Sequence, residues 1–208
     1  MLSSSLPVAA HTFGNLYHAS LTDTLRGLAR AGFRQVEIAT TPPHVYTPGI
    51  SADERRQLSR LLRDLGLIAC SLTPTFGDLN LSSPNAEVRE LSVRQVAQAV
   101  QLAHDIEAPT VVVVPGRRHP MVRLPVAGAR RVFLRSIEDL LPVAEGLGIR
   151  IAVENTAYGV MGTAPELVAL ADEFNGAIGL VYDSANAIVQ EDPAEGVRII
   201  AEHLVLAH

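Results

Sequence analysis

Short apolar runs alternate with longer amphipathic segments along the chain, and this alternation limits the fold more than any other feature. Each run has the length of a β-strand, and each intervening segment has the apolar spacing or the caps of a helix. Strict alternation predicts a parallel sheet whose consecutive strands are joined by helices. The seven predicted strands cover residues 6–12, 35–40, 67–72, 110–114, 150–154, 178–183 and 203–208.

Six helices are predicted between these strands, because polar caps and glycines stand where helices begin and end. Ser51 and Glu54 form a capping-box pattern at the start of the second helix, and Gly66 follows its last apolar residue. Thr163 opens the fifth helix, whose first turn tolerates Pro165. The connections are therefore long enough to cross from one parallel strand to the next.

Two α/β architectures have this alternation. An open doubly wound sheet normally carries a glycine-rich phosphate loop, and the chain has neither G-x-G-x-x-G nor G-x-x-x-x-G-K. A (β/α)8 TIM barrel instead collects reactive side chains at the carboxyl ends of its strands. We therefore predict a barrel, with residues 1–208 as a single domain. Because such a barrel has eight strands and about 250 residues, we expect this one to be incomplete at the C-terminus, after strand seven.

The composition narrows the classes of partner. The 208 residues are 48% hydrophobic, which suffices for one core, and 17 basic and 22 acidic residues give a net charge of −5 without a basic block. We therefore expect no nucleic-acid surface and, because no apolar run is long enough, no membrane span. The chain has a single cysteine, Cys70, and its first residues lack the basic segment and the long apolar core of a signal peptide. Both features favour the cytoplasm.

The last three predicted strands end on residues that can bind metals. Glu154 lies on the same face of its strand as Ala152, opposite the face of Ile151 and Val153, because side chains alternate along a strand. The next two strands end in similar phase on Asp183 and His208. Two carboxylates and one imidazole suit hard to intermediate divalent cations. The pattern therefore predicts a metal site at the carboxyl end of the sheet.

Several short motifs, in their order and spacing, carry a resemblance to a known family. The chain resembles the sugar phosphate isomerase/epimerase superfamily, the xylose isomerase-like TIM barrels, over essentially its whole length. The motifs are GFRQVE at 32–37, LNLSS at 79–83, VVPG at 113–116, VENT at 153–156, YDSAN at 182–186 and LVLAH at 204–208.

This resemblance implies a metal-dependent sugar isomerase or epimerase. The metal ligands would be Glu154, Asp183 and His208, with a fourth carboxylate on an eighth strand that has no position here. Glu154 would also be the catalytic residue, removing the proton next to a carbonyl through a metal-stabilised enediolate. Mn²⁺ or Mg²⁺ suits this oxygen-rich set best, with Co²⁺ or Zn²⁺ as alternatives. The implied partner is a small polyhydroxy carbonyl substrate.

Three further residues are candidates for substrate binding. Asn186 stands where many relatives have a histidine, so it can hydrogen-bond a hydroxyl but cannot carry a proton at neutral pH. His11, at the end of the first strand, faces the substrate or is a buried core histidine. Arg117 begins a basic stretch with Arg118, His119 and Arg123, which is a clamp for a phosphate or carboxylate or simply a solvated loop. Glu37 is either a buried acid near the site or a salt-bridge partner at the barrel bottom.

Other functions stay open on the sequence alone. A lyase or dehydratase of the same superfamily would share the proton-removal step, and a non-catalytic barrel subunit would share the fold. The apurinic endonucleases of the superfamily need histidines at positions held here by Leu72, Val114 and Asn186, so DNA repair is not expected. A chain that ends after strand seven would leave two sheet edges unpaired, so we expect weak metal binding, proton exchange without inversion, and aggregation or a homo-oligomer.

Overall fold

The computed structural model describes residues 7–74, 78–118, 121 and 124–208. These residues form an α/β fold with seven parallel strands, as the sequence predicts. The strands are β1 (Ala9–His11), β2 (Gln35–Thr40), β3 (Ile68–Pro74), β4 (Thr110–Val113), β5 (Arg150–Glu154), β6 (Gly179–Tyr182) and β7 (Leu204–Ala207).

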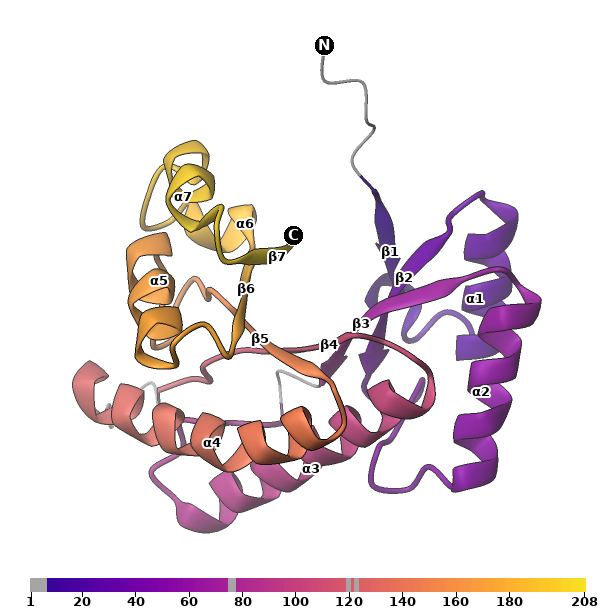
Figure 1. Cartoon of the computed structure of the whole chain (residues 1–208), viewed down its shortest axis with the longest axis horizontal. Helices are drawn as coiled ribbons and strands as arrows, with labels where there is room; N and C mark the ends of the chain where they lie inside the picture. The colour runs from indigo at the N-terminus through magenta and orange to yellow at the C-terminus, as the bar shows by residue number, and fades with distance from the viewer. Residues whose placement is uncertain (1–6, 75–77, 119–120, 122–123) are drawn as a thin grey trace.

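Helices connect the strands and cover the outside of the sheet (Figure 1). The helices are the 3₁₀-helix η1 (Thr12–Asn15), α1 (Leu21–Arg30), α2 (Ala52–Asp64), α3 (Ala86–Asp105), α4 (Val126–Gly146), α5 (Ala164–Glu173), α6 (Ser184–Ala187) and α7 (Pro193–Ile200). The predicted capping box is present at Ser51 and Glu54, each side chain bonding the other's backbone N–H. The short helices η1 and α6 were not predicted, because four residues are too few to show helical spacing.

The strands lie side by side in chain order, from β1 to β7, and the sheet curls into an incomplete barrel (Figure 1). Each helix therefore returns the chain to a strand next to the previous one, as in a TIM barrel. Several predicted strand boundaries were wrong by one residue, and two were wrong by more. The first strand begins at Ala9 rather than at residue 6, and the third extends to Pro74, which adds Thr73 to the sheet.

The two faces of the sheet bury different residues. Outward side chains such as Ile151 and Val153 belong to the large core between sheet and helices. Inward side chains form a second, small cluster of Val112, Ala152 and Val181. Glu154 lies two residues after Ala152 on the same strand, so it points into the barrel. The predicted strand phase is therefore confirmed for β5.

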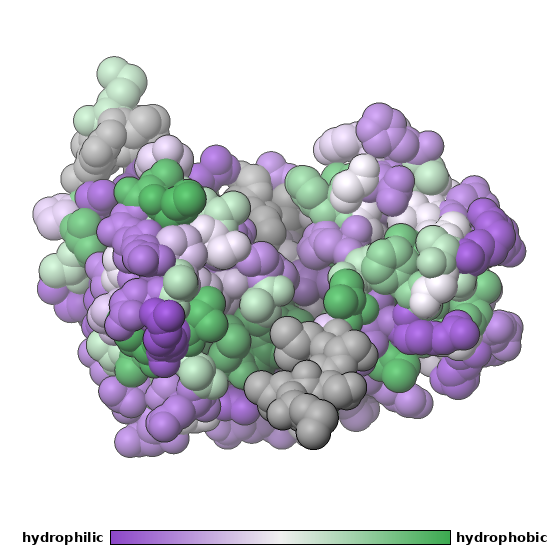
Figure 2. All heavy atoms as spheres, turned by 90° about the horizontal axis from the view of Figure 1, so that it is seen from above, coloured by the Kyte–Doolittle hydropathy of each residue, from purple (hydrophilic) through white to green (hydrophobic). Residues whose placement is uncertain are grey.

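The surface seen from above carries apolar and polar side chains interspersed over both flanks of the molecule (Figure 2). Within the described part of the chain, no helix combines the length and the apolar character that crossing a membrane requires.

Candidate active site

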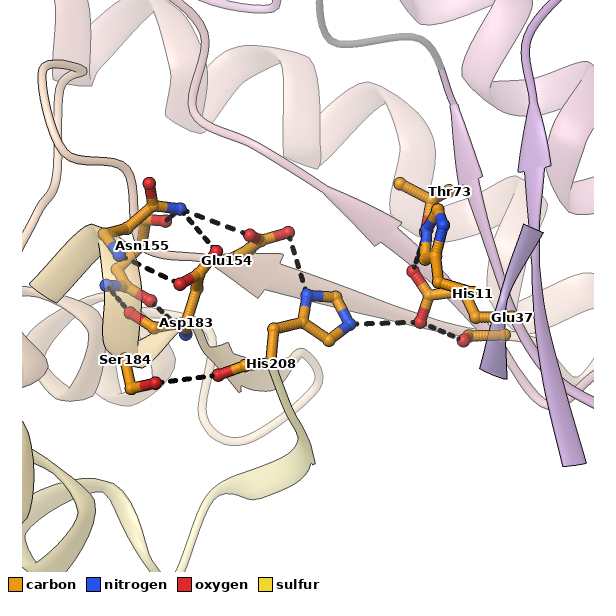
Figure 3. A network of polar contacts seen from close by, with 10 residues as sticks. His11, Glu37, Thr73, Glu154, Asn155, Asp183, Ser184 and His208 are labelled. Atoms are coloured by element: carbon orange, nitrogen blue, oxygen red, sulfur yellow. Dashed lines mark hydrogen bonds and ion pairs between the residues drawn. The ribbon is translucent and has the colours of Figure 1, made fainter. Parts of the chain in front are cut away.

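Glu154, Asp183 and His208 lie together at the carboxyl ends of β5, β6 and β7 (Figure 3). One carboxylate oxygen of each acid and one ring nitrogen of the histidine lie within 4.8 Å of one another. The sheet register produces this, because Tyr182 pairs with Ala207 and the next residue of each strand leaves the sheet beside the other. The convergence predicted from three strand ends is thus present in the fold.

Backbone hydrogen bonds hold Asp183 and His208 in place. The buried side chain of Asn155 contacts the backbone of Asp183 twice. Its Nδ2 donates to the Asp183 carbonyl at 2.9 Å, and its Oδ1 accepts from the Asp183 N–H at 2.7 Å. His208 N–H donates to the carbonyl of Tyr182 at 2.8 Å, and Ser184 N–H donates to the carbonyl of His208 at 3.1 Å. Sequence reasoning missed Asn155, although it directly follows Glu154 in the VENT motif.

Asn186 bridges the two carboxylates. Its Nδ2 lies 2.9 Å from Asp183 Oδ2, 3.4 Å from Glu154 Oε1 and 3.1 Å from the carbonyl oxygen of Asn155. Asp183 also accepts from the Asn186 N–H, which caps the short helix α6. The structure therefore places Asn186 beside the acids, while its contact with a substrate stays a prediction.

Glu37, in β2, is the second buried acid of the site and is only 3% exposed. Its two oxygens accept hydrogen bonds from four side chains, which come from β1, β3 and the end of β7. The donors are Ser71 at 2.6 Å, Thr73, His11 at 3.1 Å and His208 at 3.1 Å. Of the two roles that the sequence leaves open for Glu37, the structure shows the buried acid near the site.

The hydrogen bonds of His11 define its tautomer. Nδ1 accepts the backbone N–H of Phe13 at 2.9 Å, so the ring proton is on Nε2 and is donated to Glu37. Both ring nitrogens therefore have partners within the chain, although the side chain is 32% exposed and lines a cavity. The predicted substrate contact of His11 stays a prediction.

His208 lies between the two acids, with Nε2 toward Glu37 and Nδ1 at 3.6 Å from Glu154 Oε2 (Figure 3). The ion pair with Glu154 and the hydrogen bond to Glu37 raise the pKa of His208 to about 10. Burial alone would raise the pKa of Glu37, but the hydrogen bonds of His11 and His208 and the charge of His208 hold it well below its usual range. Burial raises the pKa of Glu154 despite the nearby histidine.

Glu154 Oε2 is buried and has no hydrogen-bond partner among the described residues. An unpaired buried carboxylate oxygen is costly unless a cation or a proton compensates it. The donor set around it, two carboxylates and one imidazole, suits a divalent cation. The residues present therefore fit a metal ion, with the Nε2–H of His208 held by Glu37 in the manner of carboxylate–histidine pairs at metal sites.

Two adjoining cavities open at this end of the barrel. The smaller, about 290 Å³, is lined by Glu154 and Asn186, and it shares Arg117, Tyr158 and other residues with a cavity of about 800 Å³. Arg117 thus lies near the acids, as its predicted role requires, but its contact with a substrate stays a prediction. His119 and Arg123, from the same basic stretch, lie outside the described residues.

A curled parallel sheet with acids and an imidazole at its carboxyl ends defines a barrel of the TIM type. The model of a family described as "Xylose isomerase-like TIM barrel" matches residues 25–208, and the chain belongs to this family. An uncharacterized protein of Methanocaldococcus jannaschii is 28% identical over 182 residues. The match covers 86% of this chain and 60% of that protein, so the chain spans less than two thirds of this relative.

Solved structures with the same fold include several epimerases. A D-tagatose 3-epimerase-like protein is 25% identical with a TM-score of 0.83, covering 96% of this chain and 74% of that one. L-ribulose 3-epimerase is 19% identical with a TM-score of 0.81, covering 97% and 68%. The 3-keto-D-glucoside 4-epimerase of E. coli is 14% identical with a TM-score of 0.83, covering 98% and 78%. The last two similarities show the fold alone.

Proposed function

We propose that this chain carries the active site of a divalent-metal-dependent isomerase or epimerase. The substrate would be a small polyhydroxy ketone or aldehyde that loses the proton next to its carbonyl. One observation supports this most: Glu154, Asp183 and His208 converge from three consecutive strand ends beside a cavity. Similarity to the D-tagatose 3-epimerase-like protein supports sugars as the substrate class.

Glu154, Asp183 and His208 would hold the ion. Because two of the three ligands are carboxylates, Mn²⁺ or Mg²⁺ suits them best, and the imidazole also admits Co²⁺ or Zn²⁺. When bound, the ion would polarise the substrate carbonyl as a Lewis acid and so acidify the neighbouring C–H group. Glu154 Oε2 supports this assignment, because it is buried without a hydrogen-bond partner among the described residues and its ion-pair contact with His208 Nδ1 is long, at 3.6 Å.

The side chains around the ion would divide the remaining work. Glu154 would take the proton from the substrate carbon, and its placement in the smaller cavity supports this role. Asn186, in the same cavity, would hydrogen-bond a substrate hydroxyl. Glu37 would act as a positioning residue, because its bond to Nε2 of His208 directs Nδ1 toward Glu154.

Proton exchange measured by NMR tests the proposed function directly. The protein, loaded with Mn²⁺ and then freed of excess ion, would be incubated in D₂O with D-fructose, D-tagatose and L-ribulose and with their phosphate esters. We expect loss of the signal of the C–H group next to the carbonyl of at least one ketose, with no loss after chelation by EDTA. Product stereochemistry then shows whether the centre is inverted.

Two results would contradict the proposal. One is metal-loaded, folded protein that exchanges no C–H group in any of these compounds. The other is exchange that survives both EDTA and replacement of Glu154 by Gln, since that would place the base elsewhere. A product that has lost water would assign the same site to a lyase instead of an isomerase.

A further inference from the structure

The cavity of about 800 Å³ is continuous in its lining with the cavity at Glu154. Arg117, Ala157, Tyr158 and Gly159 line both spaces. A substrate whose reacting carbons lie at Glu154 would therefore extend its distal end into the larger cavity. Its volume lies within the range of small-molecule sites, about 300–1,000 Å³.

The lining of the larger cavity is basic. Two guanidinium groups, of Arg117 and Arg118, contribute to it, and none of its described lining residues is an aspartate or a glutamate. This contrasts with the chain as a whole, whose net charge is −5. The described residues of the lining are Asn80, Ser83, Pro84, Asn85, Arg117, Arg118, Ala157, Tyr158, Gly159 and Gln190.

Arg118 has an unused donor. Its Nε is buried and has no hydrogen-bond partner among the described residues, none of which forms an ion pair with it. A buried N–H group without a partner is costly to leave unpaired. An acceptor brought by a ligand would remove this penalty, whereas the existing lining does not.

The walls of the cavity are tied together by hydrogen bonds. Asn80 Nδ2 donates to the carbonyl of Arg117 at 2.8 Å, and Asn80 Oδ1 accepts from the Arg117 N–H at 3.3 Å. This contact needs a glycine at position 116, where φ is +87° and a Cβ would collide with Asn80. Elsewhere in the lining, Gln190 Nε2 donates to the carbonyl of Ala157 at 2.9 Å. The backbone of Arg117 is therefore held in position before any ligand arrives.

We propose that this cavity binds an anionic group, a phosphate or a carboxylate, at the distal end of the substrate, with Arg117 and Arg118 as its ligands. Guanidinium groups pair with such anions through parallel, charge-assisted hydrogen bonds. A neutral sugar would offer only hydroxyl acceptors. The position of the reacting carbons rests on the proposed function, but the anion site itself does not and is tested without turnover.

Calorimetric titration with inorganic phosphate and with acetate, at low ionic strength, tests the site. Arg117→Gln and Arg118→Gln each remove one guanidinium, and Arg60→Gln, an exposed arginine of α2, is the matched control. We expect each of the first two variants to weaken binding of the preferred anion about tenfold, because a charge-assisted hydrogen bond is lost. We expect Arg60→Gln to bind like the unsubstituted protein. Circular dichroism verifies that each variant is folded. Because Arg117 is exposed, Arg117→Gln should leave the core intact even if Arg118→Gln does not fold.

Anion affinity that is equal in all four proteins, or absent in the unsubstituted one, overturns the proposal. Comparison of phosphate with acetate identifies which anion the site prefers. Arginine-dependent anion binding without any metal-dependent proton exchange would support the site and contradict the proposed function. Metal-dependent exchange of a neutral ketose without anion binding would support the proposed function and contradict the anion site.

Discussion

Two buried carboxylates on either side of His208 have opposite surroundings. Glu37 in β2 has four hydrogen-bond donors on its two oxygens, two of them histidines. Glu154 in β5 has only long contacts, 3.4 Å from Asn186 Nδ2 to Oε1 and 3.6 Å from His208 Nδ1 to Oε2, and Oε2 has no hydrogen-bond partner among the described residues. Both side chains are almost completely buried, so solvent does not make the difference.

The different surroundings shift the pKa values of the two carboxyl groups in opposite directions. Burial raises the pKa of both groups, but at Glu37 the two histidines outweigh burial and the carboxylate is stabilised. At Glu154 burial prevails and the pKa is raised. Glu37 is thus a satisfied structural anion, whereas Glu154 is an acid that gains when a cation or a proton reaches it. Reactivity is expected at the acid that the fold leaves unsatisfied.

The largest expected effect is that of Glu154→Gln on catalysis. Proton exchange should fall about 10³-fold or more, because a positioned base alone is worth roughly 10²–10⁴-fold and a ligand is lost as well. The free energy of unfolding should stay within about 1 kcal/mol of the original, because the easier burial of a neutral amide offsets the loss of the long ion pair with His208. Urea unfolding of metal-free protein measures this. Destabilisation as large as that of Glu37→Gln would erase the distinction between the two acids.

Glu37→Gln should act mainly on stability. We expect the free energy of unfolding to fall by about 3 kcal/mol, because a buried charged partner of two histidines is removed. Metal affinity should fall about 10–100-fold, because His208 loses the group that orients it. Ser71→Ala, which removes one donor and no charge, is the control and should lose about 1 kcal/mol. A loss of stability for Glu37→Gln no greater than that for Ser71→Ala would contradict the role of Glu37 as a structural anion.

The pH dependence of stability in metal-free protein is a finer test. The lowered pKa of Glu37 stabilises the fold fully above pH 4.5, and this contribution is lost as pH falls below that value. The pKa of His208, raised from 6.5 to about 10, stabilises the fold fully below pH 6.5, and this contribution is lost as pH rises through about 10. Urea midpoints should therefore decline from pH 6.5 to pH 10. A flat profile over that interval in the unsubstituted protein would show that His208 is not held as a cation.

Much of the fold follows from local sequence. Alternation predicted the seven strands, and strand phase placed Glu154 on the inner face with Ala152, where the structure has it. Helices such as α6 were missed because their four residues carry no periodic signal. The ends of the strands were predicted least accurately. The structure extends β3 by two residues beyond its predicted end, and one of them, Thr73, donates a hydrogen bond to Glu37.

The site was only partly predictable, because its second half depends on long-range pairing. Glu37 and His208 are 171 residues apart, and nothing near Glu37 in the sequence indicates which side chains surround it. The same holds for Asn155, whose amide binds the backbone of Asp183, 28 residues away. The three metal ligands could be predicted because residues of ligand type stand at three strand ends. The groups that orient them, Glu37 and Asn155, have no such pattern in the sequence.

Binding of Mn²⁺ tests the central claim most directly. Calorimetry would compare the unsubstituted protein with Asp183→Asn, which preserves the cap of α6, and with Asp53→Asn, which removes an exposed acid of α2. We predict one bound ion in the unsubstituted protein, affinity reduced tenfold or more in Asp183→Asn, and unchanged affinity in Asp53→Asn. Equal Mn²⁺ affinity in all three proteins would contradict a metal site at Glu154, Asp183 and His208.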